Sequence, residues 1–99
     1  MKILIYISGP VTGRDPWEVS RSFRHAEDHI RYEIEQLPVN PLNFAIKGLS
    51  YEEQMSLDLD VLKHCHAIYM LNGWDESKGA CAELSVAKAL GLTVFYETM

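Results

Sequence analysis

The sequence predicts an α/β fold in three layers, α/β/α, built around a parallel four-stranded sheet. Short runs rich in Ile, Val and aromatic residues alternate with longer segments whose apolar residues recur at helical spacing, in the order β-α-β-α-β-α-β. The first and third runs are apolar throughout, which is typical of parallel strands buried on both faces. Right-handed crossovers then place helices on both faces of one sheet.

Each expected strand has its own signal. The four strands are expected at residues 2–8, 37–41, 67–71 and 92–97. The second is short and has a proline on each side of Val39 and Asn40. Because proline cannot donate to a ladder of hydrogen bonds, this strand is expected at an edge of the sheet.

The expected helices, residues 16–36, 51–64 and 77–90, begin or end with recognisable capping residues. Asp15 is suited to the N-cap of the first, with Pro16 at the first helical position. Ser50 and Glu53 have the spacing of a capping box at the start of the second. Gly91 follows the third and is typical of a helix end. Trp17, in the first turn, is expected to pack against the domain.

Length, composition and charge set the broad class. The 99 residues are 47% hydrophobic, which predicts one folded domain over residues 1–99. No apolar run approaches the roughly 20 residues of a membrane span, and the N-terminal run is too short for a signal peptide, so a cytoplasmic protein with no membrane partner is expected. The net charge of -5 argues against a nucleic-acid partner. Cys65 and Cys81 are expected to be reduced thiols.

Two carboxylates fall on helix faces that should be apolar. Glu83 lies among the apolar residues of the third helix, which are Ala80, Ala82, Leu84, Val86, Ala87 and Leu90. Asp58 lies inside the apolar stripe of the second helix, which is Tyr51, Met55, Leu57, Leu59, Val61 and Leu62. A buried unpaired carboxylate is costly. Each acid could therefore cap an amide or pair with a base, or the two could form a site at the carboxyl ends of the strands.

A pair of such acids has a definite chemical use. Glu83 lies in the first turns of its helix, where the positive end of the dipole favours the ionised form. An ionised, partly desolvated carboxylate can attack a sugar carbon, and a second carboxyl that holds a proton can protonate the leaving group. The two acids therefore indicate cleavage of a glycosidic bond.

Three further motifs allow more than one interpretation. The loop from Ser8 to Arg14 has two glycines and donors that suit an anion, but it also reads as a simple tight turn. His64 and His66 point different ways and have no third ligand nearby, so no metal and no other cofactor is expected. Trp74 could stack on a base or sugar, or serve as a lid or interface residue.

The segments IYISGPVTG (5–13), DLDVLKHCHAIYML (58–71) and GWDESKGACAE (73–83) together resemble the nucleoside 2-deoxyribosyltransferase superfamily, and within it short bacterial and phage relatives of unassigned function. The resemblance covers nearly the whole chain and implies a flavodoxin-like or Rossmann-like fold. It also implies a nucleoside or nucleotide as the small-molecule partner, and a homo-oligomer.

The resemblance also implies roles for individual residues. Glu83, four residues after Gly79, corresponds to the nucleophile; Asp58 corresponds to the acid that assists at the nucleobase, and Tyr6 to the tyrosine that orients the nucleophile. Related nucleotide N-glycosidases hold a 5′-phosphate with residues that correspond here to Ser8, Gly9, Thr12, Gly13, Arg14 and Ser77. Ala80 stands where a Ser or Thr often occurs, and full transferases have a C-terminal extension with which a neighbouring subunit completes the site.

The sequence thus favours an enzyme that cleaves the N-glycosidic bond of a deoxynucleoside or its 5′-monophosphate, by hydrolysis or by transfer. A non-catalytic nucleotide-binding module on the same fold is the alternative. A purely structural assembly protein is a third possibility.

Overall fold

The four strands form one parallel sheet in the order β2-β1-β3-β4, as seen in the computed structural model, which describes residues 1–98. The elements are β1 (Leu4–Ser8), α1 (Pro16–Asp28), η1 (His29–Ile34), β2 (Leu37–Val39), η2 (Pro41–Phe44), α2 (Tyr51–Leu62), β3 (Ala67–Met70), η3 (Trp74–Glu76), α3 (Lys78–Ala89) and β4 (Thr93–Tyr96). The predicted fold class and the edge position of the short second strand are confirmed.

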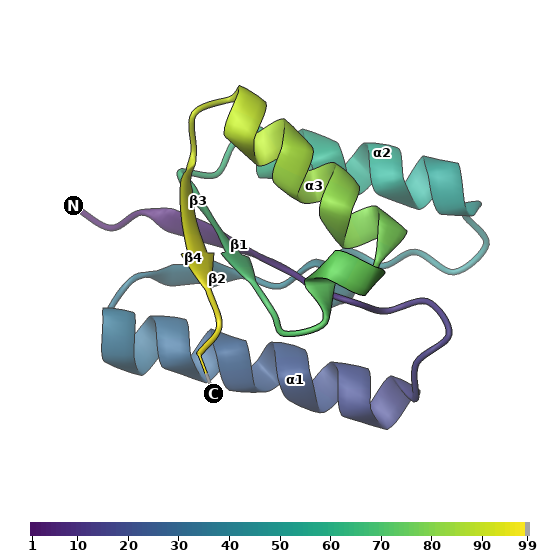
Figure 1. The fold of residues 1–99 in the computed structure, drawn as a ribbon, viewed down its shortest axis with the longest axis horizontal. Coiled ribbons are helices and arrows are strands. Elements are labelled where there is room, and N and C mark those ends of the chain that lie inside the picture. Colours follow the sequence, from purple (N-terminus) through teal and green to yellow (C-terminus); the bar gives the residue numbers. More distant parts are fainter. Residues whose placement is uncertain (99) are drawn as a thin grey trace.

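Helices cover both faces of the sheet. Figure 1 shows α1 along one face, and α2 and α3 side by side on the other. The connections leaving β1 and β3 therefore run to opposite faces, and the gap between these two strands is the switch point at which open α/β sheets bind ligands.

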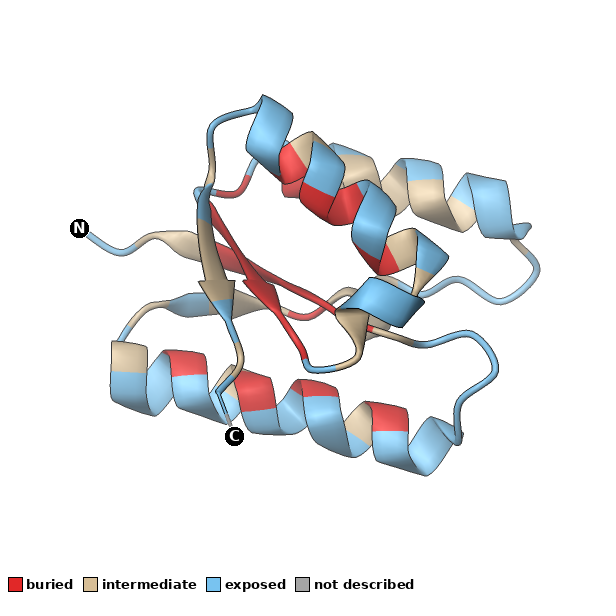
Figure 2. Ribbon diagram, in the orientation of Figure 1, coloured by how far each residue is buried: buried red, intermediate tan, exposed pale blue. Residues whose placement is uncertain are grey.

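The alternation of side chains along β1 decides which helix each residue meets. Ile5 and Ile7 belong to the core on the α1 side, together with Phe23 of α1. Tyr6 belongs to the core on the α2 and α3 side. Ser8, two residues after Tyr6, faces the same way. Figure 2 shows β1 and β3 as the most buried part of the sheet.

The helix starts agree with the capping residues in the sequence. The side chain of Asp15 accepts from the amide of Trp17, and Ser50 and Glu53 form the predicted capping box. Ser77 caps α3 by accepting from the amide of Ala80. These caps fix where α2 and α3 begin, and so fix which of their residues face one another.

The first helix differs from the prediction. It is α-helical only to Asp28, continues as the π-helical segment η1, and ends at Glu35, which has a positive φ of 62°. A non-glycine residue in the left-handed region gives no sequence signal for a helix end, so the prediction overran to residue 36. The expectation that Trp17 packs was also wrong, because this residue is 79% exposed.

The buried stripe of α3 is narrower than the helical wheel predicts. Ala80, Glu83, Leu84 and Ala87 are buried, whereas Ala82 and Leu90 are exposed. In a small domain the helix contacts the sheet along one line only, so apolar residues at the margin of the stripe remain in solvent. Glu83 nevertheless lies on the buried line, as its spacing predicts.

Candidate functional site

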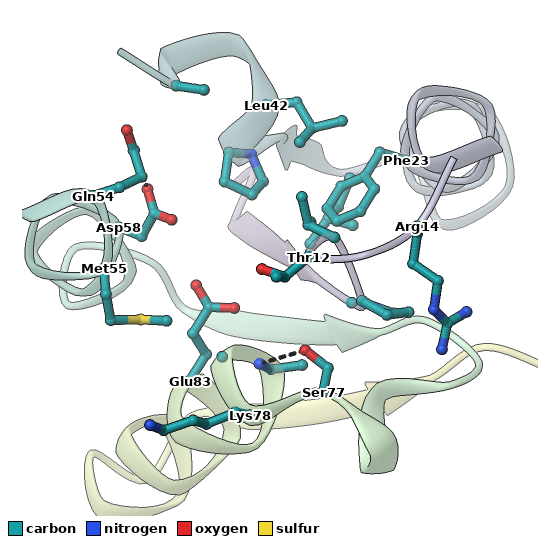
Figure 3. Close-up of a pocket in the computed structure, with 18 of the residues that line it drawn as sticks. Thr12, Arg14, Phe23, Leu42, Gln54, Met55, Asp58, Ser77, Lys78 and Glu83 are labelled. Atoms are coloured by element: carbon teal, nitrogen blue, oxygen red, sulfur yellow. Dashed lines mark hydrogen bonds between the residues drawn. The ribbon is translucent and has the colours of Figure 1, made fainter. Parts of the chain in front are cut away.

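A cavity of about 590 Å³ opens at the carboxyl ends of β1 and β2, between the loop after β1 and helices α2 and α3. This volume is within the range of about 300–1,000 Å³ that is common for small-molecule sites. Figure 3 shows the carboxylate of Glu83 pointing into the cavity, with Asp58 and Gln54 on the α2 wall and Thr12 on the opposite side.

Two hydroxyl groups of β1 hold the Glu83 carboxylate. The Tyr6 hydroxyl donates to Oε2 and the Ser8 hydroxyl donates to Oε1, each at 2.6 Å. Both donors come from one strand and point to one face because they are two residues apart. Bonds of this length are typical of hydroxyls that donate to a carboxylate. Glu83 is therefore held by neutral donors and has no ion-pair partner within residues 1–98.

Burial controls the protonation of Glu83. It raises the pKa of this carboxyl to about 7; the hydroxyls of Ser8 and Tyr6 work against burial, and Asp58 adds to it. The expected effect of the helix N-terminus, which favours the ionised form, is outweighed, because Glu83 is only 6% exposed. The protonated and ionised forms of this carboxyl are consequently both accessible near neutral pH.

Tyr6 keeps its proton in this environment. Burial, followed by the charge of Glu83, raises the pKa of Tyr6 well above its ordinary value of 10.0. The hydroxyl therefore keeps its proton near neutral pH and donates it to the hydrogen bond with Glu83.

Asp58 reaches the cavity from the third turn of α2. Burial raises the pKa of Asp58, and the hydrogen bond from Gln54 Nε2 to Oδ1, at 2.9 Å, opposes this rise. No arginine or lysine forms an ion pair with Asp58 in the described part of the chain. Two carboxyls with raised pKa values thus line one cavity.

The other predicted site residues divide into three groups. Gly9, Thr12, Arg14, Ser77 and Gly79 line the cavity with Glu83 and Asp58. Ser8 is fully buried beneath Glu83 and is a partner of that carboxylate, not a residue of the cavity wall.

Gly13 and Trp74 lie outside the cavity lining as the structure describes it. Gly13 is exposed in the turn before α1, with a φ of +77°. Trp74 is half-buried and packs against the ring of Tyr96, with 5.9 Å between the ring centroids.

Gln54, Met55, Phe23 and Lys78 also line the cavity and were not identified from the sequence. A signal existed for Gln54, which precedes Asp58 by four residues and so shares its face of α2. Phe23 and Met55 could be read only as core residues, and Lys78 only as a surface residue.

His64 and His66 are exposed on either side of buried Cys65, and His66 Nδ1 accepts from the amide of Leu4 at 3.0 Å. No group of three or more potential metal ligands occurs in residues 1–98. Both cysteines are free thiols, and no helix in this part of the chain could span a membrane.

Gly9 is required by the close approach of the cavity loop to β3. A Cβ atom at this position would lie 2.8 Å from both Cβ and Cδ1 of Leu71. We expect Gly9→Ala to lower the free energy of unfolding by about 1–3 kcal/mol, because a backbone-fixed Cβ cannot rotate away. Urea denaturation measures this change. Ser56→Ala, on the exposed face of α2, is the control, and an equal effect of both substitutions would contradict the steric explanation.

Comparison with known proteins places the chain in a family. Residues 3–96 match the family described as a domain of unknown function, DUF4406. The chain belongs to this family. No curated protein matches the chain significantly by sequence.

One solved structure with a similar fold is a 2-desoxiribosyltransferase from Leishmania mexicana. It matches with a TM-score of 0.69 and 21% identity, over 95% of this chain and 63% of that one. The DUF4406 chain therefore spans less than two thirds of the length of that protein. A likeness at this identity shows a common fold, and it confirms the fold relationship that the sequence motifs predict.

Proposed function

We propose that this DUF4406 protein cleaves the N-glycosidic bond of a deoxynucleoside or deoxynucleoside 5′-monophosphate. The observation that carries the proposal is the Glu83 carboxylate at the base of the cavity, held by Tyr6 and Ser8 without a cationic partner, with Asp58 lining the same cavity. The fold shared with a protein named a deoxyribosyltransferase adds support.

In the proposed reaction, the ionised Glu83 attacks C1′ of the sugar and forms an ester bond as the bond from C1′ to the base nitrogen breaks. The base leaves with the bonding electron pair and receives the proton of Asp58. Water, or a second base in a transfer reaction, then attacks C1′ and displaces Glu83, and Asp58 takes up the proton of the attacking group. Tyr6 and Ser8 hold Glu83 in place throughout.

The covalent intermediate provides the direct test. Incubation with a 2-fluoro-2-deoxynucleoside should add the mass of the fluorinated sugar to the intact protein, because the fluorine slows the second step more than the first. Peptide mapping should place the adduct on Glu83. The absence of an adduct, together with no base release from any nucleoside or nucleotide, would contradict the proposal.

The role of Asp58 has its own test. We expect Asp58→Asn to slow base release by about 10²-fold or more, because general acid catalysis is worth about that much. A 2-deoxyriboside of nitrophenol, whose leaving group needs no proton, should be cleaved by the variant at nearly the normal rate. Equal losses with both substrates would show that Asp58 does not act as the acid.

A nucleotide-binding module without turnover is the second candidate. It is favoured by the pKa of Glu83, about 7, because a protonated carboxyl binds through hydrogen bonds but is a poor nucleophile. This candidate predicts that nucleotides raise the melting temperature equally in the natural protein and in Glu83→Gln, with no product formed. The expected homo-oligomer stays a prediction, which light scattering in solution would check.

A further inference from the structure

Both the oxygen and the nitrogen of the Gln54 side-chain amide form hydrogen bonds. Its Oε1 accepts from the backbone amide of Ile46 at 3.0 Å, and its Nε2 donates to Asp58 Oδ1 at 2.9 Å and to the carbonyl of Phe44 at 3.4 Å. Gln54 therefore connects the segment after η2 to the carboxyl of Asp58.

These contacts fix the orientation of the amide. A backbone N–H can only donate, so Oε1 of Gln54 must face Ile46. A carbonyl can only accept, so Nε2 must face Phe44. The group directed at Asp58 is therefore an N–H donor.

The orientation of the amide has a consequence for Asp58. The carbonyl oxygen of a carboxylic acid is a stronger acceptor than its hydroxyl oxygen, so an N–H donor at one oxygen favours protonation of the other. When Asp58 is protonated, the bond from Gln54 to Oδ1 therefore favours the proton on Oδ2. A carboxyl without such a neighbour could carry the proton on either oxygen.

We propose that Gln54 is a positioning residue, which selects Oδ2 as the atom from which Asp58 delivers its proton and fixes the carboxyl against the cavity wall. This inference rests on the proposed function for its catalytic meaning, but the contact between Gln54 and Asp58 can be tested without turnover.

The titration of Asp58 is the first readout. The charged or titratable groups that face it are Glu83 from α3 and Tyr6 from β1. Other such groups that line the cavity are Arg14, Tyr51, Glu76 and Lys78. The Gln54 bond favours the ionised form of Asp58, so its loss in Gln54→Met should move the Asp58 titration upward by about one pH unit. Carboxyl ¹³C NMR of the free protein measures this titration.

Gln36→Met is the matched control. Gln36 also anchors a backbone amide, since its Oε1 accepts from Ile3 at 2.7 Å, but it does not line the cavity that the structure describes. Its substitution should leave the Asp58 titration unchanged. Gln54→Glu is the second variant, because it preserves the acceptor for Ile46, removes the donor to Asp58 and adds a negative charge beside that carboxyl. It should also move the Asp58 titration upward.

Activity gives the second readout. In Gln54→Met the limb of the pH–rate profile that reports Asp58 should move upward with the Asp58 titration, and kcat should fall on the order of 10-fold with little change in KM. If the natural protein releases no base but the titration still moves, the proposed function fails and the positioning inference stands. An Asp58 titration that stays in place in both Gln54 variants would overturn the inference, whatever the activity.

Discussion

Glu83→Gln is expected to abolish base release and covalent labelling, with a loss on the order of 10³-fold or more in kcat/KM. Glutamine has nearly the same shape as glutamate; its amide oxygen can accept from one of the Tyr6 and Ser8 hydroxyls and its NH2 can donate to the oxygen of the other. The amide oxygen, however, does not form a stable bond to C1′. The measurement is the release of free base from a panel of deoxynucleosides and their 5′-monophosphates.

A control and a rescue experiment sharpen this test. Glu18→Gln, on the exposed side of α1, removes one carboxylate far from the cavity and should leave the rate unchanged. In Glu83→Ala, azide should enter the vacated space and yield a 2-deoxyribosyl azide of inverted configuration. Base release by Glu83→Gln at the normal rate would exclude Glu83 as the nucleophile.

The second large expected effect of Glu83→Gln is on stability: the substitution should stabilise the folded protein, although it abolishes activity. The pKa of Glu83 is about 7 in the folded chain, against an ordinary value of 4.5. The unfolded chain therefore releases this proton first, and folding becomes less favourable as pH rises from 4.5 through 7. The full difference corresponds to about 3 kcal/mol.

We therefore expect Glu83→Gln to gain stability relative to the natural protein between pH 4 and pH 8, by about 3 kcal/mol. Urea denaturation of both proteins at these two pH values measures the gain, and groups common to both cancel in the comparison. Glu18→Gln controls for the loss of one negative charge. A difference between Glu83→Gln and the natural protein that is the same at both pH values would show that burial does not perturb this carboxyl.

Local patterns in the sequence were sufficient for most of the fold. Alternating strand and helix signals predicted the layers, and the prolines beside Val39 predicted the edge strand. The spacing of Glu83 within α3 also predicted its burial. Each of these inferences depends on residues near one another in the chain, where periodicity and capping act directly.

Features that depend on contacts between residues distant in the chain were harder to predict from the sequence. Ser8, the last residue of the expected first strand, was assigned to phosphate binding through the resemblance and the glycine loop that follows it, whereas its hydroxyl donates to Glu83 of a distant helix. The bond between Gln54 and Ile46 is formed with a segment of no regular pattern. For Glu83, the helix dipole was visible in the sequence, whereas the desolvation that outweighs it appears only after folding.

The two acids of the cavity differ in how firmly they are attached to the domain. The partners of Glu83 lie on β1, an inner strand. Asp58 and its partner Gln54 instead lie on α2, and Gln54 is bonded to the segment before that helix. Exchange of residues 41–58 between homologous domains should therefore alter which base is accepted while the chemistry at the sugar is retained. In the proposed reaction, the acid that attacks the sugar would thus be held by the sheet, and the acid that faces the base by a peripheral helix.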